Sequence, residues 1–330
     1  MKMKKMRGMI AVLGTAVLMA GVVGCGGGSK ESSAAESMSV AIETKAAAST
    51  AEESVAETTA AAAKSTAAET TVAETTAASS SGITLEPQLL LEKDGIKITA
   101  QEYVTDELWG DGIKLLVEND TDKKVTVSTN ALIINNYMVT DSFAAEVAAG
   151  KKANEVMYLD SDELEAAGVD NIGQIEIYFC AYDPESYDTL WDADVVTFQT
   201  SAYAQMDMTA DEEKEGLELF NEAGIRVVGM AVDENSYWGK SILFYIENTS
   251  DKNVYVSVED LSINGYMMEP YYAQMVYAGK KAVSAMDLFQ NDLDANNIKS
   301  IDEVELKFQV YDAVTFEDIV VSDPISFATE

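Results

Sequence analysis

Residue types that commonly carry catalysis are sparse in this sequence, with the exception of carboxylates. The 330 residues include 57 Asp and Glu, 22 Lys and Arg, and no histidine. The chain therefore lacks the commonest general base and transition-metal ligand, and no Ser-His or Cys-His arrangement can form. The formal net charge of −35 also excludes nucleic acid as a partner, because such binding depends on neutralising phosphates.

The densest group of carboxylates lies in one predicted loop. Its members are Asp183, Glu185, Asp188, Asp192 and Asp194. Carboxylate oxygens suit a hard cation such as Ca²⁺, but this spacing fits no EF-hand loop. The sequence favours a solvated acidic loop, with a calcium site as the alternative. A carboxylate pair of the glycosidase type would need a defined separation that sequence does not supply. We expect no cofactor and no enzymatic activity.

Cys25 and Cys180 are the two cysteines, and we expect no intramolecular disulfide because the lipidation of Cys25 argued below leaves Cys180 as the one free thiol. Ile175, Ile177 and Phe179 alternate as one face of a predicted strand, which places Cys180 on the other face. We expect a partly exposed thiol that no histidine activates. It is either inert or forms an occasional intermolecular disulfide.

The N-terminus predicts export and a lipid anchor. A basic cluster in residues 1–7 precedes the apolar run 9–23, which is shorter than the ~20 residues that span a membrane. This order is typical of a secretory signal peptide. The run ends Val22-Val23-Gly24-Cys25, which resembles the lipobox of bacterial lipoproteins. That resemblance implies cleavage after residue 24 and a diacylglyceryl lipid on Cys25. It also implies attachment to the cell membrane on its extracytoplasmic side.

Residues 25–83 form a compositionally biased segment rich in Ala, Ser, Thr and Glu, with no aromatic residue. Such a segment cannot bury enough apolar surface to offset its ordering entropy. We expect a disordered linker after the lipidated cysteine, with an average reach of roughly 40–45 Å.

The remainder is an internal duplication. Residues from Gly95 onward align without a gap with those from Gly224 onward, and about a third of the positions are identical. Pairs that recur include Trp109-Gly110 with Trp238-Gly239, and Glu118-Asn119 with Glu247-Asn248. We define repeat 1 as residues 84–203, repeat 2 as residues 217–330, and 204–216 as the inter-domain linker.

The sequence of each repeat predicts an all-β domain. Apolar and polar residues alternate with the period of strands, and Asn264-Gly265 suits a tight hairpin turn. Asp160 to Gly168 predicts a short capped helix, and residues 291–297 a weaker second copy. About seven strands per repeat favour an immunoglobulin-like β-sandwich. A small open barrel is the alternative.

The repeated motifs Glu-Asn-x-x-Asp-Lys, Asn-x-Tyr-Met and Ala-Gly-Lys-Lys resemble those of tandem Ig-like lipoproteins of Gram-positive bacteria. These proteins lie near the domain families of unknown function DUF4352 and DUF5067. The resemblance covers residues 84–330, together with the lipobox and the linker. It implies an Ig-like fold and attachment to the membrane, and it assigns no catalytic residue.

Aromatic residues in repeat 2 suggest a contact surface. Tyr271, Tyr272 and Tyr277 have Ser142, Phe143 and Ala148 at the corresponding positions of repeat 1. The fold therefore does not require tyrosine at these positions. We expect the three side chains to contact a partner, since Tyr is enriched in interface cores.

These observations predict a membrane-anchored extracytoplasmic lipoprotein. Its expected function is that of a non-enzymatic surface binding or spacer module, with an unknown surface or protein partner. An accessory or sensor subunit of a neighbouring membrane complex is one alternative. A carboxylate-based, calcium-supported enzyme is the other.

Overall fold

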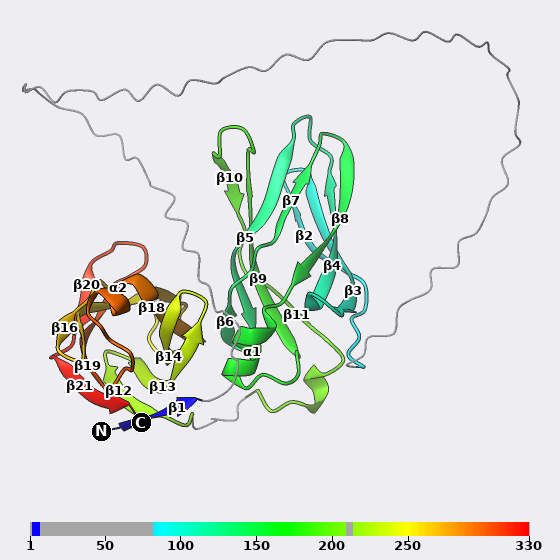
Figure 1. Ribbon diagram of the computed structural model, residues 1–330. Helices are drawn as coiled ribbons and strands as arrows, with labels where there is room; N and C mark the ends of the chain where they lie inside the picture. Colours follow the sequence, from blue (N-terminus) through cyan, green and yellow to red (C-terminus); the bar gives the residue numbers. More distant parts are fainter. Residues whose placement is uncertain (1, 7–81, 209–213, 330) are drawn as a thin grey trace, which may run out of the picture. The chain divides into compact units, whose positions relative to one another are not determined.

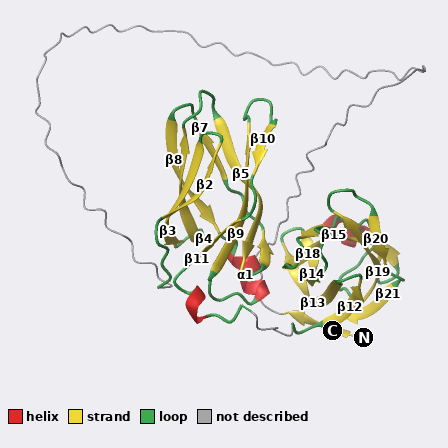
Figure 2. Cartoon of the chain, turned by 180° about the vertical axis from the view of Figure 1, so that it is seen from behind, coloured by secondary structure: helices red, strands yellow, loops and turns green. Residues whose placement is uncertain are grey.

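The computed structural model describes residues 2–6, 82–208 and 214–329. Figure 2 shows that strands dominate and that the helices are short. One sheet of repeat 1 has the order β2-β3-β4-β8. Its strands are β2 (Gln88–Lys93), β3 (Ile96–Asp106), β4 (Gly110–Asn119) and β8 (Lys151–Tyr158).

The other sheet of repeat 1 is built on two long strands, β5 (Val125–Ile134) and β9 (Gln174–Tyr182), which pair antiparallel. Four short strands extend it: β6 (Tyr137–Val139), β7 (Ala144–Val147), β10 (Thr189–Asp192) and β11 (Val196–Gln199). β6 and β7 pair with opposite ends of β5, and β10 and β11 with opposite ends of β9.

Repeat 2 has the same organisation (Figure 1). Its first sheet pairs β12 (Leu217–Glu222), β13 (Ile225–Ser236), β14 (Gly239–Asn248) and β18 (Lys281–Phe289) in that order. Its second sheet pairs β15 (Val254–Ile263) with β19 (Glu303–Asp312). The short strands are β16 (Tyr266–Met267), β17 (Ala273–Val276), β20 (Asp318–Val321) and β21 (Ile325–Thr329).

The expectation of an all-β, tandem sandwich fold is confirmed, but the strands are more numerous than expected. The described part of repeat 1 contains β2 to β11 and that of repeat 2 contains β12 to β21, against about seven expected in each. The register shifts between Thr129 and Ala131, where β5 meets β9. Such a bulge bends β5. Because β5 is bent, two short strands pair with its two ends in place of one long strand.

Each repeat has its own apolar core between its two sheets. Ile98 and Ile177 are fully buried in repeat 1, as are their equivalents Val227 and Leu306 in repeat 2. Strand alternation explains this, because every second side chain faces the opposing sheet. The outer face of the first sheet of repeat 2 is also apolar and buried, in a separate cluster that includes Leu243.

The predicted turns and helices form. Asn264 and Gly265 have φ of 51° and 83°, and Asn135 and Asn136 have 49° and 72°, as a type I′ turn requires. Helix α1 (Ser161–Ala167) begins after Asp160, whose carboxylate accepts the Asp162 and Glu163 N–H groups, and ends at Gly168. The weaker second helix is α2 (Gln290–Ala295), and a 3₁₀ turn, η1, covers Tyr203–Gln205.

Strands of the two repeats also pair within one compact unit. β6 runs parallel to β18, with Tyr137 opposite Lys281. Beside this pairing, the Lys280 ammonium contacts both Glu176 carboxylate oxygens at 2.6 and 2.7 Å. Strand β1 (Lys2–Met6) pairs with β13 and β21 of repeat 2. No helix among the described residues is long and apolar enough to cross a membrane.

Candidate functional site

The outer face of the second sheet of repeat 2 carries a row of apolar side chains. Val254 and Val256 of β15 are fully buried, so the intervening Tyr255 faces away from the core. Its register partners are Met275 of β17 on one side and Tyr311 of β19 on the other. Directly paired residues share a face, so the three side chains lie side by side. We call Met275, Tyr255, Tyr311 and the adjacent Phe316 the outer stripe.

The rings of the outer stripe lie nearly parallel to one another. Tyr255 and Tyr311 have ring centroids 5.3 Å apart and planes inclined by 20°. Phe316 lies 6.3 Å from Tyr255 at 17° and 6.3 Å from Tyr311 at 31°. Phe316 is 68 % exposed, and the two tyrosines are half-buried. Sequence reasoning did not select these residues, although Tyr255 alternates with buried valines and could have been found by that signal.

The hairpin between β19 and β20 holds Phe316 in an unusual backbone conformation. Phe316 has φ of 57°, which is costly for a bulky residue. The Asp312 carboxylate accepts the Val314 N–H at 2.9 Å and the Thr315 N–H at 3.0 Å. The Phe316 N–H in turn donates to the Asp312 carbonyl at 2.9 Å. These bonds fix the turn and direct the Phe316 ring towards the tyrosines.

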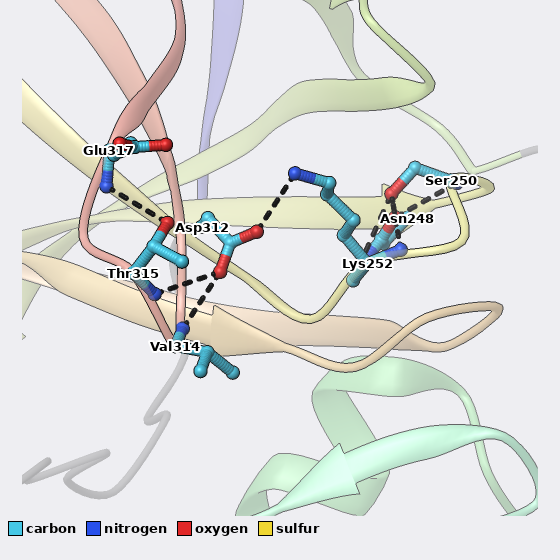
Figure 3. Close-up of polar contacts among 7 residues, drawn as sticks. All are labelled: Asn248, Ser250, Lys252, Asp312, Val314, Thr315 and Glu317. Atoms are coloured by element: carbon cyan, nitrogen blue, oxygen red, sulfur yellow. Dashed lines mark hydrogen bonds and ion pairs between the residues drawn. The ribbon is translucent and has the colours of Figure 1, made fainter.

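Lys252 anchors the same hairpin to the neighbouring turn. Its ammonium donates to the Asp312 carboxylate at 2.9 Å (Figure 3). This bond, with the backbone N–H groups of Thr315 and Val314, lowers the pKa of Asp312 to about 2. Glu317 and Asp318 are exposed nearby. The outer stripe is therefore bordered by negative charge, which repels an anionic ligand.

Repeat 1 has the same hairpin with a less apolar face. Its Asp183 carboxylate accepts the Glu185 and Ser186 N–H groups, and Tyr187 has φ of 61°. The Tyr187 ring stacks on Tyr182 at 6.1 Å and 19°. At the positions of Tyr255 and Met275, however, repeat 1 has Thr126 and Glu146. The extended stripe is therefore a property of repeat 2.

The three tyrosines predicted as a contact surface do not lie together. Tyr272 is 9 % exposed and its ring meets Phe244 in the core at 5.5 Å, so its assignment to a surface was wrong. The alternation of apolar and polar residues did not determine which face of the sheet Tyr272 would occupy. Burial raises the pKa of the Tyr272 hydroxyl. Tyr277 is half-buried, with its ring edge-on to Tyr178 at 4.9 Å. Tyr271 alone is well exposed, at 72 %.

Tyr271 belongs to a second aromatic group. Its ring meets Phe289 at 5.5 Å and 70°, Phe289 meets Trp238 at 6.0 Å and 75°, and Trp238 meets Tyr237 at 4.9 Å and 89°. Edge-to-face contacts of this kind stabilise the rings against one another. The rings of this group meet at 70–89°, whereas those of the outer stripe are inclined to one another by only 17–31°. The outer stripe is therefore the better candidate site.

The predicted acidic loop forms hydrogen bonds within itself and to strand β5. Asp188 accepts from the Ser186 hydroxyl at 2.8 Å and Asp192 from the Asn130 amide at 2.8 Å, while Asp183 caps its own turn. Glu185 and Asp194 have exposed side chains. Within the described part of the chain, no three acidic or thiol side chains are placed to hold a metal ion. The calcium site stays a prediction.

Cys180 is half-buried on the outer face of β9, as its place in the alternation indicated. Its register partners are Ser128 and Asp192. Burial, together with the nearby carboxylates of Asp192 and Asp141, raises the pKa of this thiol to about 11. The thiol is protonated at neutral pH and is a poor nucleophile.

A buried carboxylate in repeat 1 makes its stability depend on pH. Glu163 of α1 is 8 % exposed, and its carboxylate accepts the Thr140 N–H at 2.6 Å and the Thr140 hydroxyl at 2.7 Å. Burial raises its pKa from 4.5 to about 7, despite these bonds, and the carboxylates of Asp160 and Asp141 add to the effect. A raised acid pKa means that the folded state retains its proton longer than the unfolded state.

We expect repeat 1 to lose up to about 3 kcal/mol of stability as the pH rises from about 4.5 to about 7, and little more above that. Glu163→Gln should remove most of this slope in urea unfolding followed by hydrogen exchange at pH 5 and 7.5. The equivalent residue of repeat 2, Asp292, is exposed, so Asp292→Asn is the matched control. A Glu163→Gln variant with the wild-type slope would contradict the assignment.

The lipobox residues Val22, Val23, Gly24 and Cys25, and most of the linker, lie outside the described residues. No protein-family model and no curated protein matches the chain. Solved structures that resemble it include the Salmonella enterica SafA pilin in complex with the SafB chaperone. That match has 12 % identity, covers 72 % of this chain and 98 % of the other, and has a TM-score of 0.22.

Two further matches are similar in extent. The CsuC–CsuE chaperone–tip adhesion subunit complex of Acinetobacter baumannii matches with 10 % identity, covering 67 % of this chain and 93 % of that one, with a TM-score of 0.20. A protein of unknown function from Porphyromonas gingivalis W83 matches with 9 % identity, 67 % and 90 % coverage, and a TM-score of 0.17. TM-scores this low say nothing about function.

Proposed function

We propose that this chain is a membrane-anchored, extracytoplasmic lipoprotein whose second sandwich is a non-enzymatic binding module. The outer stripe is the observation that supports the binding role. It offers nearly parallel, partly exposed rings on an open sheet face, held by a hairpin that keeps Phe316 at a positive φ. Strain retained in this way, and present at the equivalent position of repeat 1, is typical of a functional surface.

The ligand that fits this surface is a glycan strand without net negative charge. Pyranose rings have apolar C–H faces that stack on flat aromatic rings, and their hydroxyl groups stay hydrated at an open site. The carboxylates of Glu317 and Asp318 beside the stripe, and the net charge of −35, disfavour polyanions. A chain anchored through Cys25 and extended by the linker would meet such strands in the cell wall.

Sedimentation with insoluble peptidoglycan, stripped of anionic polymers, tests this function. The protein used begins at residue 25 and carries Cys25→Ser, because the proposed lipid would otherwise hold it in a membrane. Tyr255→Thr with Met275→Glu installs the residues that repeat 1 has at the same positions, so the fold should tolerate them. We expect binding to weaken at least tenfold.

Tyr271→Ser is the matched control, because Ser142 is its repeat 1 equivalent and its ring lies in the edge-on group. This variant should bind as the parent chain does. Equal binding by the Tyr255→Thr/Met275→Glu protein, or no binding by the parent chain, would contradict the proposal.

A further inference from the structure

The two repeats differ in the segment that precedes their first strand. In repeat 1 this segment closes the core, with Ile83 and Leu85 only 6 % and 7 % exposed. Between them, Thr84 exchanges hydrogen bonds with Ser201, just after β11. The Ser201 N–H donates to the Thr84 carbonyl at 2.9 Å, and the Thr84 N–H donates to the Ser201 hydroxyl at 2.9 Å. Repeat 1 therefore uses residues 83–85 of its own chain to cover the edge of the sandwich at the end of β11.

Repeat 2 lacks the apolar residues for the same closure. At the positions equivalent to Ile83 and Leu85 it has Glu212 and Lys214. Glu212 lies outside the described residues. The Lys214 ammonium donates to the Ala167 carbonyl at 2.6 Å and lies 5.2 Å from the Tyr137 ring centroid, both in repeat 1. Charged side chains do not replace buried aliphatic ones in an apolar core.

In the structure, β1 lies at this edge of repeat 2 (Figure 1, blue strand beside the red β21). It is parallel to β21, with Lys2 opposite Ala328 and Met3 opposite Thr329. It is also parallel to β13, with Lys4, Lys5 and Met6 opposite residues 231–233. The edge of β13 is available there because β12 pairs with β13 only as far as Gly229. One short strand thus joins the two sheets of the sandwich.

We propose that repeat 2 is an incomplete sandwich whose seam, residues 231–233 of β13 and 328–329 of β21, accepts an added parallel strand. Residues 1–24 are removed in the processing proposed above, which vacates the seam. Its occupant is then an extended basic segment of a partner protein, with the chemistry of β1.

Two physical properties support that occupant. Sheet edges with unpaired N–H and C=O groups bind an extended chain by backbone hydrogen bonds. Three of the five residues of β1 are lysines, and a chain of net charge −35 attracts a cationic segment. Because this contact uses a sheet edge and not the outer stripe, it does not depend on glycan binding.

Disulfide trapping with synthetic peptides tests the seam. The protein begins at residue 25 and carries Cys25→Ser, Cys180→Ser and Ala328→Cys. The probe is the peptide of residues 2–6 with cysteine in place of Lys2, the register partner of Ala328. We expect at least tenfold more adduct than with Gln199→Cys, the equivalent position of repeat 1, where residues 83–85 already cover the edge. A full chain that retains residues 1–24 should form less adduct, because β1 competes.

A peptide of the same composition in scrambled order separates strand addition from simple charge attraction. Ordered and scrambled peptides that react equally, or equal adducts at Ala328→Cys and Gln199→Cys, would overturn the proposal. Adduct confined to Ala328→Cys and to the ordered peptide would establish the seam, whatever the outcome of the peptidoglycan experiment.

Discussion

Asn248→Ala is expected to destabilise repeat 2 by about 3–5 kcal/mol. The side chain is 1 % exposed and lies beside Ser250 and Lys252 in the turn (Figure 3). Its amide donates to the Lys252 carbonyl at 2.8 Å and to the Val276 carbonyl at 2.9 Å. Its oxygen accepts from the Ser250 N–H and hydroxyl at 2.9 and 2.7 Å. Truncation removes this partner from the buried Val276 carbonyl and releases the turn around Ser250 and Lys252.

Repeat 1 provides a second test of the same prediction. Asn119 donates to the Lys123 and Val147 carbonyls at 2.8 and 2.9 Å and accepts from Thr121. Asn119→Ala should destabilise repeat 1 by a similar amount. Urea unfolding followed by hydrogen exchange and mass spectrometry resolves the two repeats. Asp251→Ala, at an exposed position of the same turn, should change stability little. A loss below about 1 kcal/mol for both asparagine variants would contradict this role.

Gly239→Ala should cost about 3–5 kcal/mol, whereas Gly110→Ala should cost about 1–2 kcal/mol. Both glycines have positive φ, 146° and 77°. A Cβ at Gly239 would lie 2.5 Å from the Leu288 carbonyl oxygen and 2.7 Å from the Gln290 nitrogen. These are backbone atoms and cannot rotate away. A Cβ at Gly110 would meet only Ser161, at 3.8 Å.

The two glycines occupy the same Trp-Gly motif and both have positive φ, so the larger loss at Gly239 reports mainly on the backbone clash. Thermal unfolding with exchange detection should show repeat 2 alone weakened in Gly239→Ala. The Gly239 pairing with Phe289 should open first, and exchange should rise in β14 and β18. Equal losses for the two variants would show that φ, and not the backbone contact, sets the cost.

Local patterns accounted for most of the fold. Val254 and Val256 alternate with polar or aromatic neighbours, and this period of two is enough to define a strand with one buried face. Asp160 and Gly168 mark the ends of α1, because a cap is formed by residues adjacent in sequence. The bulge of β5 was missed, since a register shift is visible only when the partner strand is known.

The candidate site was predicted poorly, for a related reason. Tyr271, Tyr272 and Tyr277 are close in sequence, yet one is exposed, one is in the core and one meets Tyr178. Tyr255 and Tyr311 are far apart in sequence, yet their rings stack at 5.3 Å. Sequence proximity is therefore a poor guide to a surface built across strands, where register selects the neighbours.

The sequence by itself determined the internal duplication, the alternation of each strand, the turn residues and the absence of histidine. It also predicted the lipidated Cys25 and the linker, which lie outside the described residues. Tertiary structure alone decided that Tyr255, Met275 and Tyr311 form one row and that β1 lies at the β13–β21 seam. The reason is physical: period and turn chemistry act between residues near in sequence, whereas a shared sheet face depends on pairing between distant strands.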